Sequence, residues 1–343
     1  MKDIESLVRP NIAALAPYST ARDELSGAPD VFLDANESPY DTGFNRDPDP
    51  HQKALKQRLS VLKGLPADHI FIGNGSDEAI DLVFRVFCTP GRDNVVAIAP
   101  SYGMYEVAAA TNDIEVRKVR LRADFSLDSE ALLKATDERT KALFLCSPNN
   151  PSGNAFPEAQ LLALAETFNG IVVVDEAYID FSSIPSLRFR VDEYPNLVIL
   201  QTLSKAWGMA GLRVGLAFAN ARIIQLMSMI KYPYNINILA QKTALERLQA
   251  PIEAQVKEIV AQRAVVAALL EACPFVEKVF PSEANFLLAK VKDADALYAH
   301  LLKDGIIVRN RSRVPGCEGC LRITVGTPEE NGRLAASLKS YTL

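Results

Sequence analysis

The sequence is poor in the residues that cross-link small proteins or bind metals. Its 343 residues include five cysteines, three histidines and one tryptophan. An odd number of cysteines, thinly spread in a chain long enough to bury a core, favours reduced thiols over a disulfide framework. Cys317 and Cys320 have the spacing of redox and zinc motifs, but structural zinc needs four ligands. The histidines, at 51, 69 and 300, lie far from them in sequence, so we expect no metal site.

Long apolar runs and an excess of positive charge are also absent. No run reaches the roughly 18 apolar residues of a membrane span, and the first residues lack an apolar stretch of signal-peptide length. The net charge of −5 argues against a general binder of nucleic acid or membrane surfaces. The one basic cluster is "RNRSR" at 309–313. We expect a cytoplasmic protein that acts on small molecules.

Apolar residues make up 48% of the chain, which is enough for a sizeable core. From about residue 70, short apolar runs alternate with helical patterns. Continuous runs of this kind, separated by helices, predict an α/β fold with a mostly parallel sheet covered on both faces. A ligand site is then expected at the carboxyl ends of the strands. The predicted strands are "HIFIG", "NVVAIAP", "KALFLCSP", "IVVVDEA", "LVILQTLSK" and "RVGLAFA".

The pattern changes near residue 235, where helical periodicity takes over before the short strands "ANFLLAKV", "GIIVR" and "CLRITVG". This predicts a large domain over residues 41–235 and a smaller α+β domain over 236–343. Residues 1–40 contain four prolines and are too short to fold alone. We expect this N-terminal arm to pack with the small domain.

Polar residues follow several predicted strands where they end. After "IFI" comes "GNGSDE", in which Gly73 and Gly75 allow a tight bend and Ser76 or Asp77 can cap the next helix. Free N–H groups at a helix start suit a phosphate, although many strand–helix turns have this composition and bind nothing. The turn is neither a Walker loop nor a dinucleotide fingerprint, because it lacks the lysine of the first and the third glycine of the second.

Asp175 and Lys205 end two other strands. Asp175 can cap the next helix, or it can be a carboxylate held in a dry interior to pair with a cationic ring nitrogen. Lys205 can be a solvated strand end, or an amine whose pKa is lowered so that it forms a Schiff base. Arg213, eight residues later, can supply a positive neighbour and a phosphate contact. A lysine, an acid and a phosphate site are together what pyridoxal phosphate requires.

Several motifs, in this order and spacing, resemble the fold-type I pyridoxal-phosphate aminotransferases. They are "SPNNPSG" (147–153), "DEAYIDF" (175–181) and "TLSKAWGMAGLRVG" (202–215). Four more, "LDANESPY", "GNGSDEAIDL", "SYGMY" and "GCLRITVGT", resemble the histidinol-phosphate aminotransferase family within that class. The resemblance extends from about Val8 to Glu330. It implies a large domain with a seven-stranded, mostly parallel sheet, a smaller α+β domain, and pyridoxal 5′-phosphate as cofactor.

The resemblance also implies roles for individual residues. Lys205 forms the Schiff base with the cofactor and moves the substrate proton, and Asp175 pairs with the ring nitrogen. Tyr178 and Asn150 bond the ring's O3′ oxygen, and Tyr102 stacks on the ring. Lys205, Asp175 and Tyr178 are thus the implied catalytic residues. The implied phosphate contacts are Gly75, Ser76, Asp77, Thr202, Ser204 and Arg213.

For the substrate, the resemblance implies that Arg322 and Arg309 bind an anionic group in the small domain. Together they can accept the phosphate of histidinol phosphate in one half-reaction and the carboxylate of glutamate or 2-oxoglutarate in the other. Asn150 is shared with this pocket, and Tyr18 and Asn36 are expected to close over it. For Arg311 and Arg313 we expect a solvated loop.

One position departs from the family pattern. Where the family has a tyrosine that reaches the cofactor phosphate from a partner subunit, this sequence has Asp47, in "NRDPDP". A carboxylate repels a phosphate, so we expect weaker cofactor retention than with tyrosine. The family also implies a homodimer with shared active sites.

Three alternatives stay open at this point. An aromatic amino-acid aminotransferase and a phosphothreonine decarboxylase use the same scaffold. The anion contact at Arg309 argues against the first but not the second, because phosphothreonine also carries a phosphate. A non-catalytic cofactor-binding regulator is disfavoured, since the chain has neither a basic face nor room for a DNA-binding domain.

Overall fold

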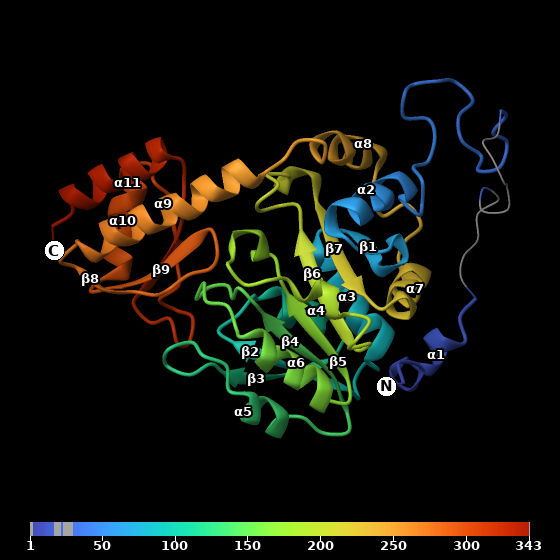
Figure 1. Cartoon of the computed structure of the whole chain (residues 1–343), viewed down its shortest axis with the longest axis horizontal. Coiled ribbons are helices and arrows are strands. Elements are labelled where there is room, and N and C mark those ends of the chain that lie inside the picture. Colours follow the sequence, from blue (N-terminus) through green and yellow to red (C-terminus); the bar gives the residue numbers. More distant parts are fainter. Residues whose placement is uncertain (1–2, 17–21, 23–29, 343) are drawn as a thin grey trace.

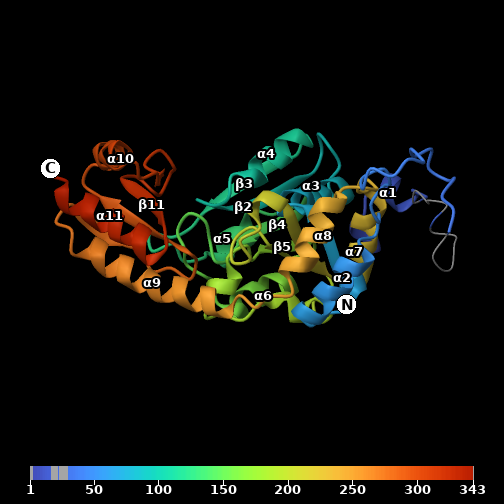
Figure 2. The same cartoon turned by 90° about the horizontal axis from the view of Figure 1, so that it is seen from above.

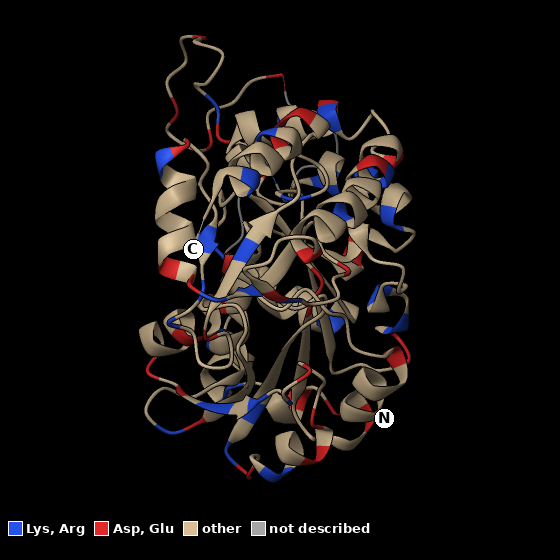
Figure 3. Ribbon diagram, turned by 90° about the vertical axis from the view of Figure 1, so that its left-hand side faces the viewer, with Lys and Arg blue, Asp and Glu red and all other residues tan. Residues whose placement is uncertain are grey.

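A computed structural model of the chain describes residues 3–16, 22 and 30–342. A large domain and a small domain lie side by side, and the long helix α9 runs from one toward the other (Figures 1 and 2). None of the described helices combines the length and the apolarity that crossing a membrane requires. Basic and acidic segments alternate over most helices on the side seen in Figure 3.

The large domain is built on one sheet whose strands lie in the order β1-β7-β6-β5-β4-β2-β3. The neighbours from β6 to β3 are parallel, and β7 runs antiparallel to both β6 and β1. The fold-type I architecture expected from the sequence is therefore confirmed. The strands are β1 (Ile70–Asn74), β2 (Asn94–Ala99), β3 (Glu115–Arg120), β4 (Thr140–Cys146), β5 (Ile171–Asp175), β6 (Leu197–Thr202) and β7 (Val214–Ala219).

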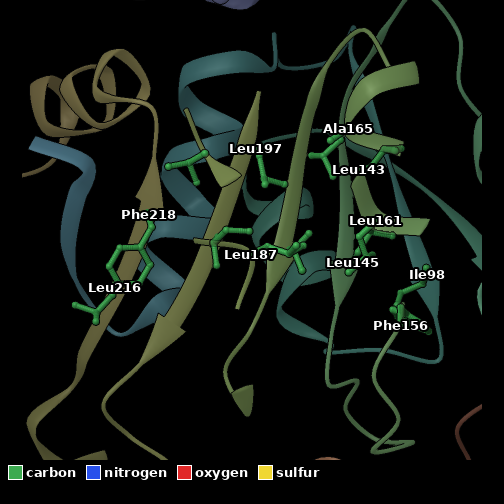
Figure 4. Close-up of a cluster of buried hydrophobic side chains, with 14 of the residues drawn as sticks. Ile98, Leu143, Leu145, Phe156, Leu161, Ala165, Leu187, Leu197, Leu216 and Phe218 are labelled. Atoms are coloured by element: carbon green, nitrogen blue, oxygen red, sulfur yellow. The ribbon is translucent and has the colours of Figure 1, made fainter. Parts of the chain in front are cut away.

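Alternate residues of each central strand pack on opposite faces of this sheet. In β4, Leu143 and Leu145 join the cluster drawn in Figure 4, whereas Ala142 and Phe144 join the cluster on the other face. Burial of each such leucine contributes about 1.5–3 kcal/mol. The first face is covered by α2 (Lys53–Lys63), α5 (Ser129–Lys134), α6 (Glu158–Thr167) and α8 (Ile238–Arg247), and the second by α3 (Ser76–Phe87), α4 (Met104–Thr111) and α7 (Ala221–Ile230).

The edge strand β3 is absent from the strands expected on apolar runs. Its sequence, "EVRKVR", is mostly charged. The strand is partly exposed, because it lies at the edge of the sheet and pairs only with β2. Charged edge strands protect a sheet from pairing with other chains. The strand therefore has no continuous apolar run by which to recognise it.

The small domain has an antiparallel sheet in the order β10-β11-β9-β8. Three helices pack on one face of it through a core that includes Leu270, Leu301 and Leu334. Its strands are β8 (Val276–Val279), β9 (Phe286–Val291), β10 (Arg309–Asn310) and β11 (Cys320–Thr324), and its helices are α9 (Glu253–Glu271), α10 (Ala294–Lys303) and α11 (Pro328–Ser340).

The beginning of the N-terminal arm lies on the large domain rather than on the small one. Ile4 and Val8 join the core cluster beneath α3 and α7, and Arg9 donates a hydrogen bond to the carbonyl of Arg85 at 3.0 Å. Ile4 and Val8 flank the short 3-10 helix Glu5–Leu7, which precedes α1 (Pro10–Ala13), and their spacing of four residues puts both side chains on one side of it. Since α8 also packs in the large-domain core, we propose that the domain boundary lies between α8 and α9.

Candidate active site

A cavity of about 130 Å³ opens at the carboxyl ends of the central strands. The carboxyl ends of β1, β4, β5 and β6 meet at this edge, as expected for an α/β fold. Every residue predicted to hold the cofactor lines the cavity, together with Cys146, Ala177 and Ala210, which were not predicted. The predicted residues are Gly75, Ser76, Asp77, Tyr102, Asn150, Asp175, Tyr178, Thr202, Ser204, Lys205 and Arg213.

Asp175 forms the acidic end of the cavity. It is the last residue of β5 and only 2% exposed. Tyr105 donates its hydroxyl proton to Oδ2 at 2.8 Å, and the backbone N–H of Ala177 donates to Oδ1 at 3.1 Å. Burial raises the pKa of Asp175 to about 6, although these two hydrogen bonds and Lys205 oppose the rise. The carboxylate thus lacks a full counter-charge and suits a cationic partner.

Lys205 lines the same cavity as this acid and Arg213. Its side chain is open toward the cavity, with Nζ 5.7 Å from the centroid of the Tyr178 ring. Surrounding protein atoms still remove much of its water, and this desolvation, with repulsion from Arg322 and Arg213, lowers the pKa of the amine. Asp175 and Asp77 oppose the shift. A larger neutral fraction makes the amine a better nucleophile and proton acceptor.

An anion cradle forms at the start of α3. The N-cap residue, Gly75, has no side chain to occupy the first N–H groups, and its N–H donates to the carbonyl of Arg213 at 2.8 Å. Gly75 has φ +76°, and a Cβ added there would lie 2.5 Å from Nη2 of Arg213. At Gly215, an added Cβ would lie 2.0 Å from the backbone nitrogen of Ser76. The glycines therefore let the backbone and the guanidinium close around a small anion.

Asp77 connects this cradle to the aromatic wall of the cavity. Its carboxylate accepts a hydrogen bond from Nη2 of Arg213 at 3.3 Å and another from the hydroxyl of Tyr102 at 3.0 Å. Burial and the negative charge of Asp77 raise the pKa of Tyr102, so its hydroxyl stays protonated. The ring of Tyr102 is thereby fixed at the cavity wall. On the strand side, Thr202 accepts the backbone N–H of Ser204 at 3.0 Å.

The predicted substrate residues do not all meet at the cavity. Arg322 donates a hydrogen bond through Nη1 to Oδ1 of Asn150, and its guanidinium lies 5.2 Å from the ring centroid of Phe286. Arg309 lies directly opposite Arg322 on β10. Asn36 is exposed in the N-terminal arm, with φ +56°, and does not line the cavity. Tyr18 lies outside the described residues.

Asp47 lies after the arm, in the segment that precedes α2, and does not line the cavity. Its backbone N–H donates to Oε1 of Glu37 at 2.7 Å. Burial opposes ionisation of Glu37, but the hydrogen bonds from Arg46, this N–H and Arg22 lower its pKa to about 2. The Asp47 backbone thus belongs to a cluster of charges that joins the arm to the segment before α2.

Two residues near the site were not predicted to take part in it. Tyr105 is fully buried in α4, yet its hydroxyl bonds the carboxylate of Asp175, 70 residues away. The pattern "SYGMY" contains it but does not reveal its partner. Arg311, expected in a solvated loop, is half-buried, and its Nε is buried without a hydrogen-bond partner among the described residues.

The residues present fit pyridoxal 5′-phosphate. The buried carboxylate of Asp175 suits a protonated ring nitrogen, and the glycine-bounded cradle with Arg213 suits a phosphate. Lys205 lines the same cavity. The described residues contain no group of three or more potential His, Cys, Asp or Glu ligands.

Comparison with known proteins gives consistent matches along the chain. The family model for class I and II aminotransferases matches residues 23–338. The chain is 56% identical over 345 residues to a histidinol-phosphate aminotransferase of Parabacteroides distasonis, with 100% of each chain covered. It is 54% identical to one of Bacteroides fragilis, over 99% of this chain and 100% of the other. A histidinol-phosphate aminotransferase structure from Clostridium acetobutylicum superposes with a TM-score of 0.79 at 25% identity, covering 87% of this chain and 90% of that one.

Proposed function

The chain belongs to the class I and II aminotransferases, and from that premise we propose that it transfers the amino group of L-histidinol phosphate to 2-oxoglutarate. The products are imidazole acetol phosphate and glutamate, which places the reaction in histidine biosynthesis. The chain is a pyridoxal-phosphate-dependent aminotransferase. Full-length identity of 50–56% to several histidinol-phosphate aminotransferases supports the substrate.

The arrangement of an amine, an acid and an anion cradle around one cavity supports the proposal most directly. Pyridoxal phosphate, when bound, supplies an electrophilic carbon for the substrate's amino group and a ring that accepts the electrons released at the substrate's Cα. Asp175 holds the proton on the ring nitrogen, because an ionised carboxylate in a dry pocket stabilises an adjacent cation. Lys205 accepts the proton from the substrate's Cα through its Nζ.

The other cavity residues bind and orient. The backbone at Gly75, Ser76 and Asp77 and the side chain of Arg213 bind the cofactor phosphate, with Thr202 and Ser204 beside them. Tyr178 and Asn150 bond the ring oxygen, and Tyr102 packs on the ring. Burial keeps the hydroxyl of Tyr178 protonated by raising its pKa, so it donates rather than accepts.

At the substrate end, we infer that Arg322 and Arg309 bind the phosphate of histidinol phosphate and, alternately, the carboxylate of 2-oxoglutarate. Arg322 is joined to Asn150, so substrate and cofactor share one hydrogen-bonded contact. Asn36 and Tyr18 are proposed to close over this pocket when a partner subunit completes it. We further propose a homodimer, since Val31 and Leu33 of the arm and Phe44 just after it are exposed in the single chain. The free thiols of its cysteines accord with a cytoplasmic location.

The test is an assay with purified holoenzyme. Histidinol phosphate and 2-oxoglutarate are expected to yield glutamate, at a kcat/KM well above that with phenylalanine or tyrosine as amino donors. Faster turnover of the aromatic amino acids would refute the substrate assignment in favour of an aromatic aminotransferase. Release of carbon dioxide from phosphothreonine, with no glutamate formed, would refute it in favour of a decarboxylase.

A further inference from the structure

Three arginines share one face of the small-domain sheet. Arg309 and Arg322 are direct partners across β10 and β11, and Asn310 pairs with Leu321. The backbone N–H of Arg311 donates to the carbonyl of Cys320 at 2.9 Å, which continues this pairing by one residue. Because side chains alternate along a strand, Arg311 lies on the same face as Arg309 and Arg322. Asn310 points the other way and donates to Asp295 at 2.6 Å.

That face is the one turned toward the large domain. Along β11, Leu321 and Ile323 pack under the small-domain helices, whereas Cys320 joins the large-domain core. Before β10, Ile306 and Val308 pack under the same helices, which fixes the alternation from that side. Arg322, on the opposite face, reaches Asn150 at the cavity. The three arginines therefore lie on the face from which Arg322 reaches the cavity residue Asn150.

Arg311 differs from an ordinary surface arginine. It is half-buried, and among the described residues its Nε has no hydrogen-bond partner and no carboxylate forms an ion pair with it, with Arg309 or with Arg322. Burial, followed by repulsion from Arg322 and Arg309, lowers its pKa, and the charge of Arg311 is felt by the hydroxyl of Tyr178. Arg313, two residues later, is exposed.

Placing like charges opposite one another on a sheet is unfavourable, as is leaving a partly buried cation unpaired. An anionic ligand bound between these side chains removes both penalties. A carboxylate has two oxygens and one charge, which a single arginine can satisfy in a bidentate contact. A phosphate monoester has three terminal oxygens and a charge near −2, so it can bond further donors at the same time.

We propose that Arg311 is a third anion-binding residue of the substrate pocket and makes that pocket favour a phosphate monoester over a carboxylate. This inference rests on the proposed function, since it concerns the same substrate site. Arg309 and Arg322 bind either anion, and Arg311 bonds the oxygen that only the phosphate has. Arg311 thus determines specificity between the two half-reactions.

The test compares the holoenzyme variants Arg311→Gln, Arg311→Lys and, as matched control, Arg313→Gln. For Arg311→Gln we expect the KM for histidinol phosphate to rise about 10- to 100-fold, the range for losing a charge-assisted hydrogen bond. The KM for 2-oxoglutarate is expected to change by less than about 3-fold, since its contacts are kept. Arg311→Lys should recover part of the loss, and Arg313→Gln should match the wild type.

Inhibition by inorganic phosphate is a second readout, and it does not require histidinol phosphate as the amino donor. Inorganic phosphate should inhibit the half-reaction with glutamate competitively, and its inhibition constant should rise in Arg311→Gln but not in Arg313→Gln. Equal effects on both substrates, or no effect on phosphate inhibition, would overturn the proposal. A selective loss of pyridoxal phosphate binding would also overturn it. If the wild type fails to use histidinol phosphate, the proposed function fails, while the phosphate measurement still decides the role of Arg311.

Discussion

Removing the hydroxyl of Tyr105 isolates the contact that keeps Asp175 ionised. The variant Tyr105→Phe keeps the ring, which packs 5.1 Å from Phe144 and 5.7 Å from Tyr102 between centroids. It deletes only the proton donated to Oδ2 of Asp175 at 2.8 Å. The carboxylate then keeps one hydrogen bond, from the backbone N–H of Ala177.

The expected size follows from the burial of this pair. A hydrogen bond to a charged group contributes about 1.5–3 kcal/mol, and 1.36 kcal/mol corresponds to one pKa unit. The pKa of Asp175 in the cofactor-free protein should rise from about 6 to roughly 7–8 in the variant. A carboxyl whose folded pKa exceeds its unfolded value binds more protons when folded, so stability falls as pH rises between the two values. The variant should therefore lose about 1.5–3 kcal/mol more stability than the wild type between about pH 5 and 8.5.

The assay is urea unfolding of the cofactor-free protein across this pH range, with carbon-13 NMR of the aspartate carboxyl carbons as a direct titration. Tyr102→Phe is the matched control, because it removes a nearby hydroxyl that donates to Asp77 instead. It should reproduce the wild-type pH dependence. An identical pH dependence in Tyr105→Phe and the wild type would refute the role given to this hydrogen bond.

Two further predictions concern the binding of the cofactor phosphate. Gly75→Ala should raise the dissociation constant of pyridoxal phosphate by at least about 10-fold, because Gly75 has φ +76° and an added Cβ would lie 2.5 Å from Nη2 of Arg213. Gly211→Ala is the control and should leave the constant unchanged, since an added Cβ there would have no atom within 4 Å. A fluorescence titration in which the two variants bind the cofactor equally well would contradict the cradle geometry. In the proposed homodimer, Asp47→Tyr should lower that dissociation constant by about 10-fold, because a hydroxyl then faces the partner subunit's phosphate site in place of a repelling carboxylate. Equal constants for Asp47→Tyr and the wild type would rule out the effect.

Much of the site was predictable because strand ends are visible in an apolar pattern. Asp175 ends β5 and Lys205 follows the end of β6 by three residues, and parallel strands bring their carboxyl ends to one edge. The partners of these residues were less accessible. Tyr105 lies on a helix and meets Asp175 only through tertiary packing, so spacing along the chain carries no sign of the contact.

The role of Arg311 depends on strand register in the same way. The run "RNRSR" does not distinguish a strand end from a solvated loop, and only the pairing of Arg309 with Arg322 fixes which side chains share a face. The packing of the first residues of the arm depends on tertiary contacts as well. The apolar pair Ile4 and Val8 does not specify which of the two domains it covers.

We propose that Lys205 makes this cavity an aminotransferase site for histidinol phosphate. The most direct measurement is glutamate formation from histidinol phosphate and 2-oxoglutarate, compared between the wild type and Lys205→Ala with both saturated in pyridoxal phosphate. Because the cradle and Asp175 remain, the variant should still bind the cofactor, while its rate falls by about 10²- to 10⁴-fold, the range for a lost acid–base group. A rate within a few-fold of the wild type would contradict the account.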